Sequence, residues 1–308
     1  MKSVILLTGP TASGKSALAV EYAVQAGNIA IINADSMQVY REIGIVSAAP
    51  SAKDLQKAEH RLYTFLPGSE QLSVAKWLEL IEKEVKNVHL QGKIPLIVGG
   101  SAMYIRILLD GISNIPEIPD EISNEVENML KNLGNDDFFA ELARLDENAA
   151  KMIKKTDKQR MLRAFSVKKH TGKSIFDFYQ NPKQKSALSD YSLAKILLIP
   201  DRNVVYNACN SRFCDMLQNG ALEEGKSLIE YGYSRDLSVH KAIGVPQIID
   251  YLEGRISHAE MVNNAQKCTR NYAKRQLTWF RNKFTDFHAI SEKNLDKFVD
   301  IIQNSVQI

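Results

Sequence analysis

The sequence predicts an α/β protein in which a parallel sheet forms the core and an all-helical domain is inserted. Short runs rich in Ile, Leu and Val are separated by segments of helical character; these runs are residues 3–8, 29–34, 94–98, 195–199 and 287–290. Apolar runs that alternate with helices are typical of parallel strands buried on both faces. A phosphate-binding motif after the first run and a long stretch without a strand candidate complete the prediction.

The motif Gly-x-x-x-x-Gly-Lys-Ser occupies residues 9–16, after the first predicted strand and before a helix that we expect to begin near Ala17. Its glycines let the backbone turn so that N–H groups face inward, where they and the helix dipole stabilise phosphate oxygens. Lys15 adds a point charge, and the hydroxyl of Ser16 is suited to Mg²⁺. The motif predicts a P-loop NTPase-like fold that holds a phosphorylated or pyrophosphorylated ligand.

Asp35 follows the second predicted strand and therefore lies at its carboxyl end, beside the phosphate loop. Ligands of α/β sheets bind at this edge. A carboxylate there can act as a general base, bind Mg²⁺, or simply form a turn, and spacing alone leaves the three possibilities open.

The strand pattern stops between Ile115 and about Ser192, where the sequence is charged and helix-forming, and it resumes at the run 195–199. We therefore expect a P-loop catalytic core made of residues 1–114 and 192–308. Residues 115–191 are expected to form the helical insertion.

The composition favours a globular protein outside the membrane. The chain has 308 residues, of which 44% are hydrophobic and 24% charged, and no apolar run approaches the ~20 residues that span a bilayer. The three cysteines, Cys209, Cys214 and Cys268, form no CxxC pair, so neither a disulfide framework nor a zinc site is indicated. We expect a cytoplasmic protein, without a membrane partner, that acts as a monomer.

Two strongly basic stretches favour a nucleic-acid partner. Residues 151–173 contain nine Lys or Arg and one acidic residue, and residues 267–283 contain six Lys or Arg and none. On a helical projection of the second stretch, one side is cationic and carries Lys267, Arg270, Lys274 and Arg281. The opposite side carries Ala265, Cys268, Tyr272 and Trp279, and we expect it to pack into the core.

The sequence resembles the bacterial tRNA dimethylallyltransferases, also called tRNA isopentenyltransferases, nearly from end to end. Five segments in the family's order carry the resemblance: GPTASGKS (9–16), NADSMQVYR (33–41), VGGSAMYIRILLDG (98–111), DKQRMLRAFSVKKHTGKS (157–174) and YAKRQLTWFR (272–281). The resemblance implies transfer of the dimethylallyl group from dimethylallyl diphosphate to N6 of adenosine 37 in the anticodon stem-loop of tRNA. The phosphate loop then holds the leaving diphosphate, and no nucleotide is hydrolysed.

The resemblance also implies residue roles. Asp35 takes the N6 proton, Ser101 replaces the threonine usual in the family, and Lys15 completes the catalytic set. Mg²⁺ is the implied cofactor, with Ser16 as its ligand. The diphosphate-binding residues are Gly9, Pro10, Thr11, Ala12, Ser13, Gly14, Lys15, Ser16 and Arg212. The tRNA-binding residues are Asp35, Ser36, Met37, Gln38, Ser101, Ser123, Gln159, Arg160, Met161, Leu162, Arg163, Arg270 and Lys274.

The sequence departs from the family pattern at residues 44–50, at 244–247 and at Ser123, where some relatives have an arginine that contacts tRNA. Three other functions remain open. An isopentenyltransferase acting on free AMP or ADP shares the loop and Asp35 but needs no RNA-binding surface. An ATP-dependent small-molecule kinase would use the loop and the acidic residue after it equally well, but does not explain the two basic stretches or the inserted helical domain. An RNA-binding protein without catalysis needs neither Lys15 nor Asp35, yet both are present.

Overall fold

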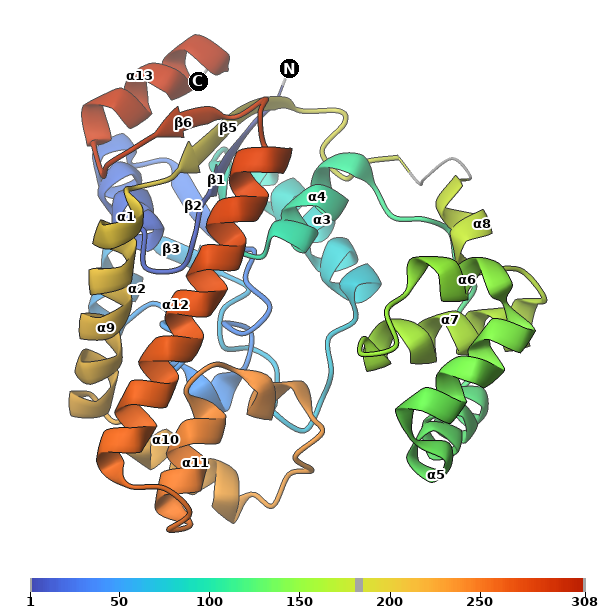
Figure 1. Ribbon diagram of the computed structural model, residues 1–308. Coiled ribbons are helices and arrows are strands. Elements are labelled where there is room, and N and C mark those ends of the chain that lie inside the picture. Colours follow the sequence, from blue (N-terminus) through green and yellow to red (C-terminus); the bar gives the residue numbers. More distant parts are fainter. Residues whose placement is uncertain (1, 181–184, 307–308) are drawn as a thin grey trace. The chain divides into compact units, whose positions relative to one another are not determined.

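The computed structural model describes residues 2–180 and 185–306 (Figure 1), and the chain divides into two compact units. The larger unit contains residues 1–109 and 187–308, and the smaller one contains residues 110–186. Among the described residues, none of the helices has the length and apolar character required to cross a membrane.

The larger unit is built on a six-stranded sheet of order β3-β2-β4-β1-β5-β6, in which every pairing is parallel. The strands are β1 Ser3–Thr8, β2 Ile29–Asn33, β3 Glu59–Arg61, β4 Ile94–Gly99, β5 Ser192–Leu198 and β6 His288–Ile290. In β1, Leu7 lies opposite Val98 of β4 and Ile196 of β5. The predicted α/β class is therefore confirmed, and the carboxyl ends of β1, β2 and β4 meet at one edge.

Helices follow the strands along the chain. In the larger unit they are α1 Lys15–Ala26, α2 Ala52–Lys57, α3 Val74–Leu90, α4 Ala102–Asp110, α9 Arg202–Gln218, α10 Ala221–Glu230, α11 Val245–Leu252, α12 His258–Lys283 and α13 Leu295–Ser305, with short 3-10 turns at Arg41–Ile43 and Ser238–Lys241. Alternate residues of β1, β2, β4 and β5 pack with α1 and α13 in one hydrophobic cluster. The other strand residues are also buried, and α3 contacts β2 and β4.

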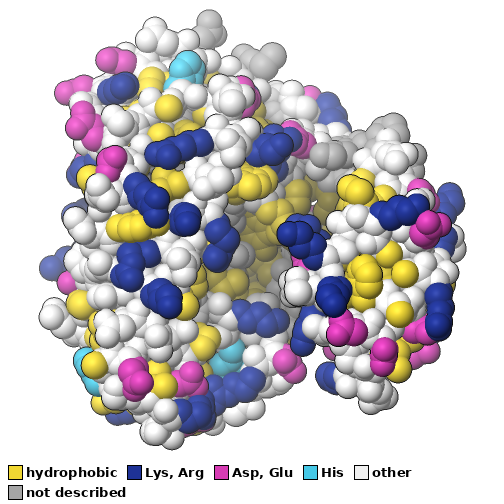
Figure 2. Space-filling model, viewed as in Figure 1, with side chains coloured by type: hydrophobic (Ala, Val, Ile, Leu, Met, Phe, Trp, Pro, Cys, Tyr) yellow, Lys and Arg dark blue, Asp and Glu magenta, His cyan; other side chains and the backbone are white. Residues whose placement is uncertain are grey.

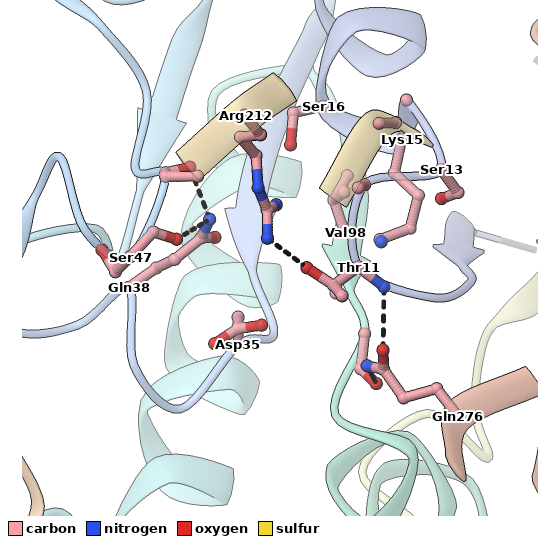
Figure 3. Close-up of a pocket in the computed structure, with 16 residues that line it drawn as sticks. Thr11, Ser13, Lys15, Ser16, Asp35, Gln38, Ser47, Val98, Arg212 and Gln276 are labelled. Atoms are coloured by element: carbon pink, nitrogen blue, oxygen red, sulfur yellow. Dashed lines mark hydrogen bonds between the residues drawn. The ribbon is translucent and has the colours of Figure 1, made fainter. Parts of the chain in front are cut away.

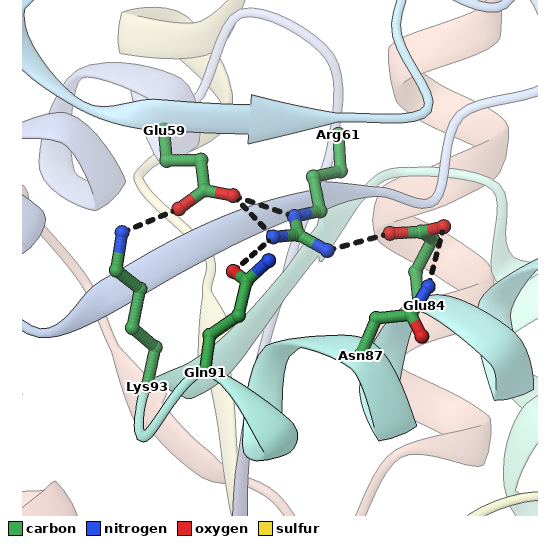
Figure 4. A network of polar contacts seen from close by, with 6 residues as sticks. All are labelled: Glu59, Arg61, Glu84, Asn87, Gln91 and Lys93. Atoms are coloured by element: carbon green, nitrogen blue, oxygen red, sulfur yellow. Dashed lines mark hydrogen bonds and ion pairs between the residues drawn. The ribbon is translucent and has the colours of Figure 1, made fainter.

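The edge strand β3 was not predicted, because its residues Glu59, His60 and Arg61 form no apolar run. Polar contacts hold it instead (Figure 4). Arg61 donates to Glu59 at 2.7 Å and to Glu84 of α3 at 2.8 Å, while Lys93 donates to Glu59 at 2.6 Å. Charged side chains at a sheet edge also oppose pairing with another chain.

The smaller unit is helical throughout its described residues and has its own core. Its helices are α5 Asp120–Leu145, α6 Glu147–Met152, α7 Lys158–Thr171 and α8 Ile175–Gln180. Phe138 and Leu142 of α5 pack with Met161 and Phe165 of α7. Gly134 interrupts α5 with non-helical backbone angles.

Candidate active site

The phosphate loop connects β1 to α1 and approaches a neighbouring strand closely. A Cβ atom at Gly9, where φ is +155°, would lie 2.1 Å from the carbonyl oxygen of Leu198 in β5. Only glycine fits there. The loop ends at Gly14, also at positive φ (+93°), and α1 begins at Lys15, so the free N–H groups of the helix start lie at the loop.

Lys15 is half-buried, and its ammonium donates to the carbonyl of Pro10 at 2.7 Å. Burial lowers its pKa from 10.5 to about 8; the charge of Asp35 opposes this shift, and that of Arg212 adds to it. An anion bound beside Lys15 would stabilise the protonated form. The ammonium of Lys15 is therefore positioned to bind a phosphate group.

A cavity of about 350 Å³ lies in front of the loop. It is lined by Thr11–Ser16, Asp35, Gln38, Ser47, Ala48, Val98, Gly99, Gly100, Ala208, Arg212 and Gln276. Lys15, Thr11 and Arg212 point into it, with Asp35 beyond them (Figure 3). Gly9 and Pro10, which were also predicted to bind diphosphate, do not line it; they shape the loop from behind.

Arg212 joins α9 to the phosphate loop, because its guanidinium donates to the hydroxyl of Thr11 at 2.8 Å. Burial lowers the pKa of Arg212 below its ordinary value of 12.5, but a guanidinium stays protonated at neutral pH. A half-buried guanidinium in a cavity wall is well placed to bind an anion.

Asp35 is held at the end of β2 by Asn33, which is fully buried. The side chain of Asn33 accepts from the Asp35 N–H at 2.8 Å and donates to the Asp35 carbonyl at 3.0 Å. One carboxylate oxygen of Asp35 accepts from the N–H of Met37 at 2.9 Å. Asn33 belongs to a recognised motif, but the sequence alone assigned it no role.

A second cavity, of about 340 Å³, shares Thr11, Asp35, Ser47 and Arg212 with the first. Its lining adds the predicted residues Ser36 and Met37. The rest of its lining combines apolar and aromatic side chains with two cations: Val46, Phe213, Met216, Ala242, Ile243 and Tyr272, with Lys241 and Arg275. Asp35 and Arg212 thus stand between the cavity at the phosphate loop and a second cavity of mixed apolar and cationic lining.

Ser101 follows Gly99 and Gly100 at the end of β4, where α4 begins. A Cβ atom at Gly99 would lie 2.2 Å from the carbonyl oxygen of Ala34, so glycine is required for β4 to pass next to Asp35. Burial and the nearby charge of Asp35 raise the pKa of the Tyr272 hydroxyl, and the neighbouring side chain of Ser101 opposes that shift. Ser101, Asp35 and Tyr272 therefore form one neighbourhood.

The side-chain amides of Gln38 and Gln276 form hydrogen bonds with backbone groups. The amide of Gln38 donates to the carbonyls of Ser47 (3.1 Å) and Ala48 (2.6 Å), which fixes the turn in residues 44–50 where the family pattern changes. Gln276 of α12 accepts from the N–H of Thr11 at 2.8 Å and donates to the Gly100 carbonyl at 2.7 Å. Gln276 was assigned no role from the sequence, although it lies in the segment 272–281 that carries the family resemblance.

The packing face predicted for the second basic stretch was wrong apart from Ala265. The residues of α12 that are buried are Met261, Ala265, Thr269, Ala273, Gln276, Leu277 and Phe280. Trp279 is 36% exposed, and Tyr272 lines the second cavity. The cationic side is as expected in part: Lys274 is exposed, whereas Arg270 is half-buried and donates to the Asn210 side chain at 2.5 Å. Figure 2 shows Lys and Arg gathered over the face that carries α12.

The remaining predicted tRNA-binding residues lie in the smaller unit. Gln159, Arg160 and Arg163 are exposed on α7, and Ser123 is half-buried on α5. Met161 is 0% exposed and Leu162 is half-buried, since both pack in the core of that unit. The side chain of Met161 therefore supports α7 and does not reach the surface.

A parallel sheet with a Gly-x-x-x-x-Gly-Lys-Ser loop between its central strand and the first helix defines a P-loop NTPase-like α/β protein. Known proteins identify its family. Residues 38–283 match the model of the IPP transferase family. The chain is 39% identical to the tRNA dimethylallyltransferase of Rickettsia conorii over 307 residues, covering 100% of this chain and 84% of the relative. It is 38% identical to that of Ehrlichia chaffeensis, covering 99% and 98%.

A solved structure agrees with these matches. The tRNA isopentenylpyrophosphate transferase of Bacillus halodurans superposes with a TM-score of 0.69 at 30% identity, covering 99% of this chain and 95% of that one. The chain therefore belongs to the IPP transferase family, that of the tRNA dimethylallyltransferases, and the resemblance inferred from the motifs is confirmed.

Proposed function

We propose that this protein transfers the dimethylallyl group from dimethylallyl diphosphate to N6 of adenosine 37 in the anticodon stem-loop of a tRNA and releases diphosphate. The observation that carries the proposal is the pair of adjoining cavities that share Asp35, Thr11 and Arg212. The cavity at the phosphate loop, with Lys15 and Arg212 in its lining, suits the diphosphate. The cavity beside it has apolar and aromatic lining residues, among them Phe213, that give room for the uncharged parts of the reactants.

Each bond change of the reaction is assigned to residues of this site. The N6 lone pair attacks C1 of the allyl chain, the C1–O bond breaks, and its electron pair leaves with the diphosphate. Lys15, Arg212 and the N–H groups at the start of α1 stabilise the charge that develops on that leaving group. Asp35 accepts the N6 proton, and the hydroxyl of Ser101 lies near the attacking amine.

Mg²⁺ is the proposed cofactor. Among the described residues no group of three or more His, Cys, Asp or Glu side chains could hold a metal ion. This donor set fits Mg²⁺ all the same, because Mg²⁺ commonly keeps several waters and uses few protein ligands together with substrate phosphates. Ser16, which is exposed in the lining of the phosphate cavity, would be the protein ligand. When bound, the ion supplies positive charge to the diphosphate.

We further propose that the smaller unit, through Gln159, Arg160, Arg163 and Ser123, and the outer face of α12, through Arg270 and Lys274, contact the tRNA. Both surfaces are rich in cations, as backbone contacts with RNA require. The protein is proposed to act as a monomer in the cytoplasm.

A transfer assay tests the function directly. Labelled dimethylallyl diphosphate and Mg²⁺ are offered without ATP to an unmodified tRNA with adenosine at position 37 and, in parallel, to AMP. Label on the tRNA alone is expected. Label on AMP would instead indicate a nucleotide isopentenyltransferase, and no label on either acceptor would contradict the proposed reaction and require the kinase test with ATP.

A further inference from the structure

Gln276 connects the phosphate loop with the loop that follows β4. Its side chain reaches in from α12, and the residue is 4% exposed. The oxygen accepts from the N–H of Thr11 at 2.8 Å, and the nitrogen donates to the carbonyl of Gly100 at 2.7 Å (Figure 3). One amide group thus joins the phosphate loop after β1 to the β4–α4 loop.

Each of these loops carries a different part of the proposed chemistry. Thr11 accepts the hydrogen bond of Arg212 through its hydroxyl, on the side of the diphosphate cavity. Gly100 lines the same cavity and directly precedes Ser101, which is proposed to lie beside the acceptor amine. The chain of contacts therefore runs from Arg212 through Thr11 and Gln276 to Gly100.

These contacts leave little freedom. A Cβ atom at Gly100 would lie 2.9 Å from the Gln276 nitrogen and 3.0 Å from the carbonyl oxygen of Gly9, so the loops and the amide are closely fitted. An unpaired amide or backbone N–H in this buried position would be unfavourable, which favours the bridged arrangement. Tyr272, one turn earlier on α12, lies near Ser101 itself.

We propose that Gln276 is a positioning residue for the transfer reaction, which fixes the phosphate loop relative to Ser101 and so aligns the allyl carbon with the acceptor amine. The inference rests on the proposed function. Gln276 acts through Thr11 and Gly100 and is not assigned a contact with the reacting atoms. The reaction needs both loops in register, because the phosphate loop holds the leaving group while Ser101 lies beside the acceptor amine.

A positioning role predicts that the loss of Gln276 lowers kcat and leaves the KM values nearly unchanged. Replacing Gln276 by Met keeps the approximate size of the side chain and removes both hydrogen bonds. We expect kcat to fall by about 10- to 100-fold, since a misplacement near ~1 Å has effects of that order. The KM values for dimethylallyl diphosphate and for tRNA should stay within about threefold, because Gln276→Met leaves the residues proposed to bind the diphosphate and the tRNA unchanged.

Gln266→Met is the matched control. It removes an amide from the same helix whose nitrogen donates to the Asn210 carbonyl at 3.1 Å, outside both cavities. We expect this variant to keep the wild-type kcat, with a Tm decrease similar to that of Gln276→Met. If Gln276→Met fails to fold, Gln276→Glu keeps the shape and the acceptor for Thr11 but removes the donor for Gly100, and its kcat should fall while the KM for tRNA holds.

The outcomes separate the inference from the function on which it rests. A wild-type protein that transfers no label to tRNA contradicts the proposed function. An active wild type together with an unchanged kcat in Gln276→Met overturns the positioning role alone. The positioning role is also overturned if Gln276→Met keeps the wild-type kcat while its Tm falls and both KM values rise, because a purely structural residue gives that pattern.

Discussion

The guanidinium of Arg212 donates to the hydroxyl of Thr11 at 2.8 Å, which places a half-buried cation from α9 at the wall that two cavities share. Because the two residues are 201 positions apart in the chain, the hydrogen bond exists only in the folded protein. It gives Arg212 a fixed orientation toward the proposed diphosphate site.

Arg212→Lys is therefore expected to weaken diphosphate binding although it keeps the charge. An ammonium lacks the planar set of donors with which a guanidinium can bind Thr11 and an anion together. We expect the KM for dimethylallyl diphosphate to rise about 10-fold, with a smaller change in the KM for tRNA, in steady-state transfer assays. Equal KM values in the variant and the wild type would remove Arg212 from the diphosphate site.

Lys15 predicts a dependence on pH. Its pKa in the folded protein is lowered to about 8, so the ammonium loses its charge as the pH rises through 8. We expect kcat/KM for dimethylallyl diphosphate to fall above that pH, because the profile reports the unliganded enzyme. In Lys15→Arg the guanidinium stays charged, and the fall near pH 8 should vanish whatever the absolute activity. An identical fall in both proteins would assign it to another group.

The same shift has a consequence for stability. Between pH 8 and the ordinary pKa of 10.5 the unfolded chain binds the Lys15 proton more strongly than the folded protein does. This group therefore makes the free energy of unfolding rise with pH in that window. The contribution of Lys15 to the free energy of unfolding is measured by urea titrations of the wild type and of Lys15→Met. The titrations are made at about pH 7.5, below the window, and at about pH 10, near its upper end. The variant should lack the increase that Lys15 contributes.

Asp35→Asn separates basicity from hydrogen bonding. Asparagine keeps an oxygen that can accept from the Met37 N–H but cannot take a proton from N6. We expect kcat to fall by about 10²- to 10⁴-fold, with tRNA affinity nearly unchanged in filter-binding assays. Near-normal turnover in Asp35→Asn would end the general-base assignment, and Asp35→Ala serves as the variant that lacks both properties.

Most strands and the location of the loop could be predicted from the sequence because their signals are local. Ile, Leu and Val fill β1, β2, β4 and β5, and the glycine motif lies within eight consecutive residues. In contrast, β3 has no apolar signal; polar partners in α3 and at Lys93 hold it. A strand of this kind becomes recognisable only when its neighbours in space are known.

The site shows the same distinction. Thr11, Lys15 and Asp35 come from recognisable motifs and Arg212 from the family resemblance, and the structure brings them to adjoining cavities. Gln276 lies within the segment 272–281 that carries the resemblance, but its role depends on Thr11, which is 265 positions away. The exposure of Trp279 was also not predicted, since helical periodicity describes a face but does not say which neighbours cover it.

The basic face of α7 gives a test of the proposed tRNA contact. Replacing Arg160 and Arg163 by Gln should weaken tRNA binding and reduce the slope of log K against log salt by about 0.7–0.9 for each phosphate that the variant no longer binds. Arg144→Gln is the control, because it removes an exposed arginine of the same unit that pairs with Glu141. An unchanged slope in the double variant would mean that this face is merely solvated.

The polar network at β3 predicts an effect on stability without an effect on the reaction. Arg61 is only 14% exposed and pairs with Glu59 and Glu84, so Arg61→Met leaves two partly buried carboxylates with fewer donors. We expect the free energy of unfolding to decrease by about 1–3 kcal/mol, measured by urea titration. Arg255→Met breaks a pair whose side chains are 53% and 42% exposed and should cost less than about 1 kcal/mol. Equal decreases in the two variants would show that burial does not strengthen the β3 network, and a lower kcat in Arg61→Met would show that the sheet edge influences the site.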